Sequence, residues 1–304
     1  MKVAALDLGS NSFLCLIVEG DSGGIRKVLS DQVKVVRLGQ GVGSTGMFKP
    51  DALARAKLCL TEFKKVIDVH KVDRILAMAT SAARDASNGS ELFKIGNDLG
   101  IPIEIIPGAD EARITFNGAT EGELRGKSNL AVIDVGGGST EIIVGNQSGI
   151  LFSKSLDIGA VRLTERFISV QPIPELERKA AEQFIDEQIA SILPALSMHS
   201  MNEILSVAGT PSAIAAAILG KFDPERVQGF VLTRSQLKDW CDMLAKTSVE
   251  EKMNDYHLEP GRADVIFIGA TILHRFLQQT NQQSMKVSIK GVRYGVALEA
   301  LSRG

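Results

Sequence analysis

One sequence pattern occurs twice in this chain, and it constrains the fold more than any other feature. Residues 3–8 form an apolar run that contains Asp7, and a glycine and three polar residues separate it from a second apolar run at 13–18. The same order returns at 130–144, where the first run contains Asp134 and the turn holds three glycines. Each copy predicts a strand, a tight turn and a second strand. We therefore expect two related halves with a cleft between them.

Between these copies, patterns typical of strands and helices alternate. An apolar stripe at i, i+3 and i+4 spacing predicts a helix over 51–69, and apolar runs predict strands at 75–79 and 101–106. The alternation predicts an α/β fold. Domains are expected at 1–127 and 128–304, divided in the polar loop 125–129, with a segment from about 291 able to pack back on the first domain. Further helices are expected at 109–123, 175–193, 211–219, 235–246 and 264–279, and a strand at 204–208.

Composition excludes several classes of protein. The 34 Lys and Arg against 36 Asp and Glu give a net charge of −2, so no overall field attracts nucleic acid or an anionic membrane. The three cysteines lack the spacing of a disulfide framework or a zinc site. Neither a signal peptide nor a long uncharged apolar stretch is evident in the sequence. These features favour a cytoplasmic protein with no nucleic-acid or membrane partner.

The two Gly-containing turns are candidate phosphate sites. In the first turn, hydroxyl, amide and backbone groups could donate to phosphate, although an ordinary hairpin turn uses the same residues. In the second, three consecutive glycines would weaken a sheet unless a ligand approaches the backbone, and the carboxylates beside them suit Mg²⁺. The candidate residues are Ser10, Asn11 and Ser12 in the first turn, and Asp134, Gly136, Gly137, Gly138, Ser139 and Glu141 in the second.

A third turn, at 207–216, places Gly209 and Thr210 between a strand and a helix. The amides at that helix start could bind an anion, whereas Pro211 in the first turn is also explained by helix capping alone. As the third such turn in one chain, it fits a nucleotide- or phosphate-binding cleft of the actin-like ATPase kind.

Two further residues bear on phosphate hydrolysis. Arg84 can pair bidentately with a phosphate. Glu111 lies in the first turn of a predicted helix, where the helix dipole favours the charged carboxylate. A charged carboxylate there suits the orientation of a water molecule better than full abstraction of its proton.

Together these blocks resemble the exopolyphosphatase / guanosine pentaphosphate phosphohydrolase (Ppx/GppA) family. The matching blocks are DLGSNS (7–12), ATSAARDASN (79–88), DEAR (110–113), DVGGGSTE (134–141), SLDIGAVRLTERF (155–167), AGTPSAIAA (208–216), GRADVIFIGATIL (261–273) and GVRYG (291–295). The resemblance implies two ribonuclease-H-like domains of the actin, Hsp70 and sugar-kinase superfamily. It implies hydrolysis of the terminal phosphate of inorganic polyphosphate, or of the 5′-terminal phosphate of guanosine pentaphosphate, with Mg²⁺ as cofactor and a homodimer as a possible assembly.

The same resemblance implies roles for individual residues. Glu111 would position the attacking water, Asp134 and Glu141 would bind the metal, and Arg84 would bind phosphate, while the phosphate pocket would comprise Ser10, Asn11, Ser12, Gly136, Gly137, Gly138, Ser139, Gly209 and Thr210. Leu14 and Tyr294 depart from the family pattern. Two alternatives stay open: an ATP-dependent kinase or ATPase of the same superfamily, and a non-catalytic sensor of guanosine tetra- or pentaphosphate.

Overall fold

The computed structural model describes residues 1–124 and 128–303. The chain forms two compact units, one of Met1–Glu121 with Lys290–Gly304 and one of Gly122–Ile289. We call them unit 1 and unit 2. The chain leaves unit 1 after Glu121 and returns to it at Lys290, whereas the sequence placed one boundary after Lys127. Lys127 itself lies outside the described residues, with most of the predicted boundary loop.

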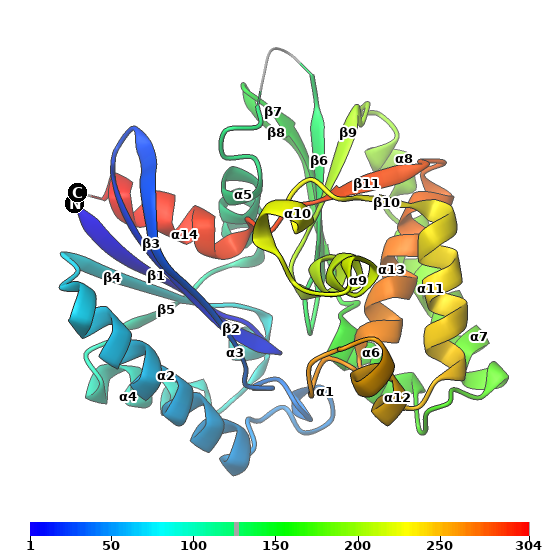
Figure 1. The fold of residues 1–304 in the computed structure, drawn as a ribbon, viewed down its shortest axis with the longest axis horizontal. Helices are drawn as coiled ribbons and strands as arrows, with labels where there is room; N and C mark the ends of the chain where they lie inside the picture. The colour runs from blue at the N-terminus through cyan, green and yellow to red at the C-terminus, as the bar shows by residue number, and fades with distance from the viewer. Residues whose placement is uncertain (125–127, 304) are drawn as a thin grey trace. The chain divides into compact units, whose positions relative to one another are not determined.

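Unit 1 is built on a mixed five-stranded sheet (Figure 1). Its strands are β1 (Lys2–Leu8), β2 (Ser12–Asp21), β3 (Gly24–Val35), β4 (Arg74–Ala79) and β5 (Ile103–Ile105), in the order β3-β2-β1-β4-β5. The pairs β1–β2 and β2–β3 are antiparallel, and β1–β4 and β4–β5 are parallel. The strand β3 was not predicted, because this edge strand is largely exposed and mixes charged with apolar residues. The sequence pattern also predicted too long a strand over 101–106, of which only three residues form β5.

Alternating side chains of the central strand pack on opposite faces of this sheet. Ala4, Leu6 and Leu8 face a core shared with α2 and α4, whereas Val3 and Ala5 face one shared with α14. Figure 1 shows α2 and α4 on one side of the sheet and α14 on the other. The helices of the unit are α1 (Val42–Thr45), α2 (Pro50–His70), α3 (Ser81–Asp85), α4 (Gly89–Asp98), α5 (Gly108–Ala119) and α14 (Val292–Ser302).

Unit 2 repeats the strand arrangement and extends it. Its sheet contains β6 (Leu130–Val135), β7 (Thr140–Asn146), β8 (Gly149–Leu156), β9 (Glu203–Val207), β10 (Val231–Thr233) and β11 (Ser284–Val287). From one edge the order is β8-β7-β6-β9-β11-β10. Its first three strands are antiparallel neighbours and β9 is parallel to β6, as in unit 1. The predicted repeat of strand, turn and strand is therefore confirmed.

Helices cover one face of the unit 2 sheet and share a core with it. Ala131, Ile133 and Val135 of β6 lie in this core with Ile185 of α7 and Phe267 of α13. The predicted helices are present, with ends shifted by a few residues, whereas α6, α8, α10 and α12 were not predicted. The helices are α6 (Ala160–Phe167), α7 (Glu175–Ala190), α8 (Leu193–Leu196), α9 (Gly209–Leu219), α10 (Pro224–Val227), α11 (Arg234–Lys246), α12 (Val249–Asp255) and α13 (Ile266–Gln279).

The C-terminal helix α14 packs against α5 within unit 1 through glycines. A Cβ atom at Gly295 would lie 1.9 Å from the carbonyl oxygen of Ile114, and one at Gly118 would lie 2.2 Å from that of Gly291. Only glycine allows backbones to approach this closely. Tyr294 of α14 is 6% exposed and belongs to the hydrophobic core that α14 shares with the sheet.

Within the described residues, every helix is too short or too polar to cross a bilayer.

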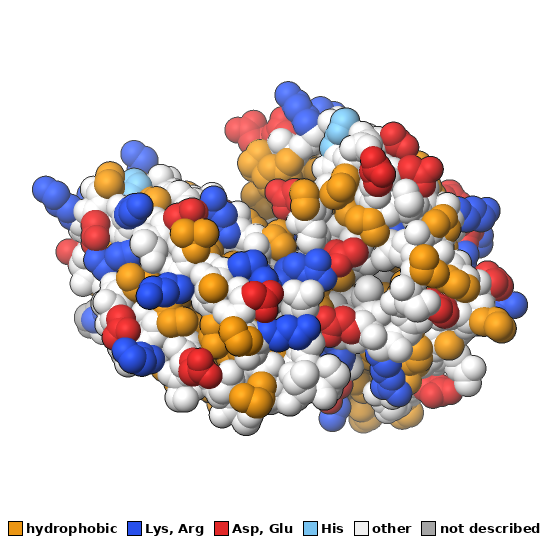
Figure 2. Space-filling model, turned by 90° about the horizontal axis from the view of Figure 1, so that it is seen from below, with side chains coloured by type: hydrophobic (Ala, Val, Ile, Leu, Met, Phe, Trp, Pro, Cys, Tyr) orange, Lys and Arg blue, Asp and Glu red, His pale blue; other side chains and the backbone are white. Residues whose placement is uncertain are grey.

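Figure 2 shows basic and acidic side chains interspersed with hydrophobic ones on one face of the molecule. On α2, for example, Lys64 pairs with Asp68 and Arg55 with Asp51, so this helix surface carries both charges.

Candidate functional site

The two Gly-containing turns close in the same way. The amide of Gly9 donates to the carbonyl oxygen of Ser12 at 3.1 Å, and the amide of Gly136 donates to that of Ser139 at 3.0 Å. A Cβ at Gly9 would lie 3.0 Å from the Ser12 carbonyl oxygen, and one at Gly136 would lie 3.1 Å from that of Ser139. The sequence repeat therefore extends to the turn geometry.

The unit 2 turn has carbonyl groups that accept hydrogen bonds, and three of its amides have no carbonyl partner among the described residues. The carbonyls of Gly136 and Gly137 accept hydrogen bonds from the first amides of α6, and Arg162 Nε donates to the Gly138 carbonyl at 2.7 Å. Across the part of the chain that the structure describes, the amides of Gly137, Gly138 and Ser139 donate to no backbone carbonyl. Successive amides left without a carbonyl partner can bind the oxygens of an anion.

Asp134 and Glu141 lie directly opposite each other on β6 and β7. Directly opposed side chains in an antiparallel pair stand on the same face of the sheet, with Cβ atoms about 5 Å apart. The two residues are 7% and 2% exposed, and Ser155 Oγ donates to Glu141 Oε1 at 2.7 Å. The corresponding pair in unit 1 is Asp7 and Leu14, so the paired carboxylates occur in unit 2 and have no counterpart at the equivalent place in unit 1.

These two carboxylates fit a magnesium site but do not complete one. No third His, Cys, Asp or Glu joins them in a metal-binding group among residues 1–124 and 128–303. Mg²⁺ binds through one or two carboxylates and keeps its remaining positions for water and substrate phosphate. The donor set therefore suits a metal that arrives with, or is completed by, a phosphate ligand.

The unit 1 turn is held by neighbouring segments. Ser10 Oγ lies 3.0 Å from Ser81 Oγ in α3, and the Gly39 amide donates to the Ser10 carbonyl at 2.7 Å. The Asn11 carbonyl accepts from the amides of Val36 and Arg37. Arg37 has a φ of 55°, an uncommon conformation for a residue with a side chain. The segment after β3 thus fixes the turn, a contact that the sequence pattern did not reveal.

Helix α3 connects this turn to the candidate catalytic acid. Arg84, at the other end of α3 from Ser81, donates through Nη1 to Glu111 Oε2 at 2.6 Å and to the Ile106 carbonyl at 2.8 Å. Glu111 is 6% exposed in the first turn of α5. Burial raises the pKa of the Glu111 carboxyl above its usual range, and the Arg84 guanidinium partly opposes that effect. The position of Glu111 at a helix start alone favours the charged form, whereas desolvation of the buried carboxyl raises its pKa.

The third turn lies against an arginine that sequence analysis did not single out. A Cβ at Gly209 would lie 1.6 Å from Nη1 of Arg262, so the guanidinium lies directly over the Gly209 backbone. The Arg262 side chain is 12% exposed, and its ion pair with the mostly exposed Glu259 spans 3.8 Å. Thr210 is buried beside Gly269 of α13. Arg262 stands inside the block GRADVIFIGATIL, which was a signal that could have identified it.

The predicted residues therefore form groups within each unit. In unit 1, α3 contacts both Ser10 and Glu111, through Ser81 and Arg84. In unit 2, Asp134 and Glu141 flank the glycine turn on adjacent strands. In the same unit, Gly209 and Thr210 lie at the start of α9, which follows β9, the parallel neighbour of β6.

Fold and turns together define the class of protein. Each unit carries three antiparallel strands followed by parallel ones, with helices on the sheet and a Gly-containing turn between its first two strands. This is the α/β arrangement expected of two ribonuclease-H-like domains, and the predicted fold class is confirmed.

The chain belongs to the Ppx/GppA phosphatase family, whose model matches residues 16–303. It is 33% identical to Exopolyphosphatase 2 of Mycobacterium tuberculosis, over 98% of each chain. Its structure is similar to that of the Aquifex aeolicus family member, with a TM-score of 0.81, 31% identity and coverage of 100% of this chain and 98% of that one. An exopolyphosphatase from Cytophaga hutchinsonii gives a TM-score of 0.90 at 26% identity, with coverage of 100% and 98%. The prediction of a phosphohydrolase that acts on phosphoanhydride bonds is confirmed.

Proposed function

We propose that this protein is an exopolyphosphatase that releases the terminal phosphate of inorganic polyphosphate by attack of a water molecule positioned by Glu111. The observation that carries the proposal is the buried Glu111 carboxylate held by Arg84 at the start of α5. Two similar proteins bear the name exopolyphosphatase, which supports polyphosphate as the substrate.

Glu111 acts on the water. Because burial raises its pKa, the ionised carboxylate is a better proton acceptor than an exposed glutamate would be. It orients the water for attack on the terminal phosphorus and accepts the proton as the phosphorus–oxygen bond to the rest of the chain breaks. In this reaction the protein mainly supplies positioning and charge neutralisation.

The phosphate groups bind to the turns and to arginine. The amides of Gly137, Gly138 and Ser139 bind phosphate oxygens, as do the groups of Ser10, Asn11 and Ser12 in unit 1. Both hydrogen bonds of Arg84 leave from Nη1, so Nε and Nη2 can donate to phosphate. Gly209, Thr210 and the overlying Arg262 add a third group of donors.

Asp134 and Glu141 would hold Mg²⁺. Their opposed positions and burial suit a small cation that keeps water and phosphate as its other ligands. When bound, the metal neutralises negative charge on the phosphate chain.

Guanosine pentaphosphate is a second candidate substrate. Its 5′-terminal phosphate is joined by the same kind of phosphoanhydride bond, so Glu111 and the turns would act on it in the same way. The resemblance also implies a homodimer, which stays a prediction.

The test is phosphate release by the wild-type protein, Glu111→Gln and Asp110→Asn, from polyphosphate, guanosine pentaphosphate and ATP, with Mg²⁺ and with excess EDTA. Asp110 is the matched control because it precedes Glu111 in the same helix turn but has a side chain 53% exposed. We expect Glu111→Gln to lower kcat by roughly 10²- to 10⁴-fold and Asp110→Asn to change it less than about two-fold.

Turnover of ATP alone would overturn the proposal in favour of a kinase or ATPase. Tight binding of guanosine tetra- or pentaphosphate without any phosphate release would overturn it in favour of a sensor.

A further inference from the structure

Unit 2 contains a lysine that is fully buried, Lys252 of α12. Burying an ammonium group costs free energy, and an apolar side chain such as Met could fill a similar volume without that cost. Burial lowers the pKa of Lys252 to about 8, although Asp264 and Glu251 oppose the shift. The contacts of the ammonium group could therefore explain why a charged residue occupies this position.

Lys252 is linked by side-chain hydrogen bonds to the segment that carries Arg262. Its Nζ donates to Gln171 Oε1, and Gln171 Nε2 donates to the main-chain carbonyl of Asp264 at 2.6 Å. Asp264 lies two residues after Arg262 in the sequence and faces the Lys252 ammonium closely enough to affect its pKa.

The segment between Glu259 and Ile266 is a compact turn. The amides of Arg262 and Ala263 donate to the Glu259 carbonyl, and those of Val265 and Ile266 donate to the Arg262 carbonyl. A constraint on the Asp264 backbone therefore also constrains the backbone of Arg262. That backbone in turn determines where the guanidinium lies over Gly209.

We propose that Lys252 is a positioning residue that acts through Gln171 and the backbone of Asp264 to hold the Arg262 guanidinium over the Gly209 turn for phosphate binding. The proposal rests on the proposed function, in which Arg262 and Gly209 bind the phosphate chain. Lys252 is too deeply buried to touch substrate, so its effect is on affinity and passes through Arg262.

A double-mutant cycle tests this inference. The variants are Lys252→Met, Arg262→Gln and the double variant, with Lys246→Met as the control because Lys246 is an exposed lysine at the end of α11. KM and kcat are measured with tripolyphosphate. We expect Lys252→Met to raise KM roughly ten-fold with kcat changed less than about two-fold, and to add nothing further in the Arg262→Gln background.

A second variant tests the hydrogen bond from Gln171 to the Asp264 carbonyl. Gln171→Glu keeps an acceptor for the Lys252 ammonium group but removes the donor to the Asp264 carbonyl. It should raise KM as Lys252→Met does, and it keeps the proposal testable if Lys252→Met fails to fold.

Hydrogen exchange separates this inference from the proposed function. Amides in the segment 259–266 should exchange several-fold faster in Lys252→Met and Gln171→Glu than in the wild type or Lys246→Met, whether or not the protein hydrolyses tripolyphosphate. If the wild type releases no phosphate, the proposed function fails, and the affinity cycle is run on tripolyphosphate binding by calorimetry. Unchanged exchange, additive effects of the two single variants, or a loss confined to kcat would overturn the positioning role.

Discussion

At the scale of single residues, two features of its surroundings have opposite effects on the ionisation of Glu111. Burial in the first turn of α5 disfavours the charged carboxylate, and the ion pair with Arg84 favours it. Because the proposed mechanism uses the ionised carboxylate as the proton acceptor, we expect activity to fall as pH drops through the pKa of Glu111.

Replacing Arg84 should move this acidic limb of the pH profile to higher pH. Arg84→Met removes the cation that opposes the effect of burial, so the pKa of Glu111 rises further. The ratio of variant to wild-type kcat/KM should then be smaller at pH 5.5 than at pH 7.5. Profiles of kcat/KM against pH measure this, with Asp110→Asn as the control. An unshifted limb would mean that Glu111 is not the titrating group.

Lys252 gives a prediction about stability rather than activity. Its pKa is about 8 in the folded protein, below the unfolded value of about 10.4, so the charged form destabilises the fold at neutral pH. Between pH 8 and about 10.4 that cost disappears, and the unfolding free energy of the wild type should rise relative to Lys252→Met by up to roughly 3 kcal/mol. Denaturant titrations followed by Trp240, the single tryptophan, report unit 2. A constant difference between the two proteins would contradict the prediction.

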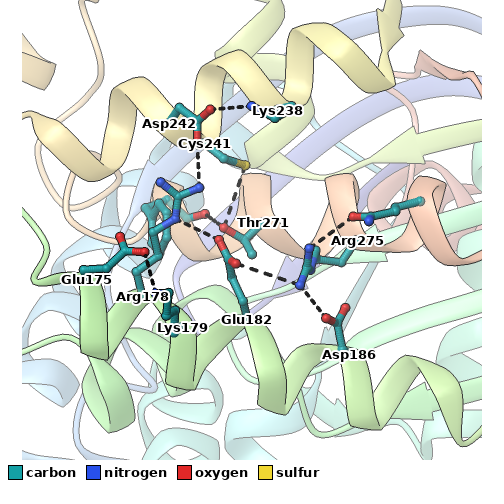
Figure 3. Close-up of polar contacts among 12 residues, drawn as sticks. Glu175, Arg178, Lys179, Glu182, Asp186, Lys238, Cys241, Asp242, Thr271 and Arg275 are labelled. Carbon is teal, nitrogen blue, oxygen red and sulfur yellow. Dashed lines mark hydrogen bonds and ion pairs between the residues drawn. The ribbon is translucent and has the colours of Figure 1, made fainter.

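At the scale of elements, ion pairs join α7, α11 and α13 (Figure 3). Arg178 of α7 pairs with Asp242 of α11 at 2.6 Å, and Arg275 of α13 pairs with Asp186 of α7. Hydrogen bonds from Lys238 and Arg178 lower the pKa of Asp242 to about 2. Because this value lies below the unfolded one, the stabilisation is present above about pH 4 and is lost as pH falls toward 2.

Asp242→Asn should remove that stabilisation. We expect a loss of about 1 kcal/mol at pH 7, reduced from the full shift because the side chain is partly exposed, and a difference near zero at pH 2. Urea titrations followed by Trp240 fluorescence measure it. Glu175→Gln is the control, because the Glu175–Lys179 pair is mostly exposed and should contribute little. A loss that persists at pH 2 would exclude the ionised carboxylate as its cause.

The helices α5 and α14 are in close backbone contact at glycines. Gly295→Ala would place a methyl group against the Ile114 backbone, which cannot move without displacing α5. We expect a lower melting temperature by far-UV circular dichroism, from a loss of roughly 1–3 kcal/mol. Gly43→Ala is the control, because a Cβ there meets no atom within 4 Å. Equal melting temperatures for the two variants would show that the helices can separate at little cost.

At the scale of the whole molecule, candidate residues lie in both units. Glu111 belongs to unit 1, and Asp134 and Glu141 belong to unit 2. Asp134→Asn should raise the Mg²⁺ concentration for half-maximal phosphate release by roughly ten-fold or more, whereas Glu111→Gln should lower kcat and leave that concentration unchanged. Magnesium titrations of the rate, and of the melting temperature without substrate, check this. Equal Mg²⁺ dependence of Asp134→Asn and the wild type would exclude Asp134 as a ligand.

The sequence by itself determined the repeated turns and the family, because these depend on local residue order. Asp-x-Gly between two apolar runs predicts a strand pair, and both copies of this pattern formed one. The exposed strand β3 was not predicted, because apolar and polar residues do not alternate along most of its length.

Only the tertiary structure decided how the side chains interact. The ion pair of Arg84 with Glu111, the guanidinium of Arg262 over Gly209 and the buried Lys252 each join residues far apart in the sequence. The return of α14 to unit 1 likewise depends on the close approach of Gly118 and Gly295 to each other's helices. Burial and pairing arise only when distant segments of the chain pack together. Burial raised the pKa of Glu111, whereas its position at a helix start alone predicted a lower pKa.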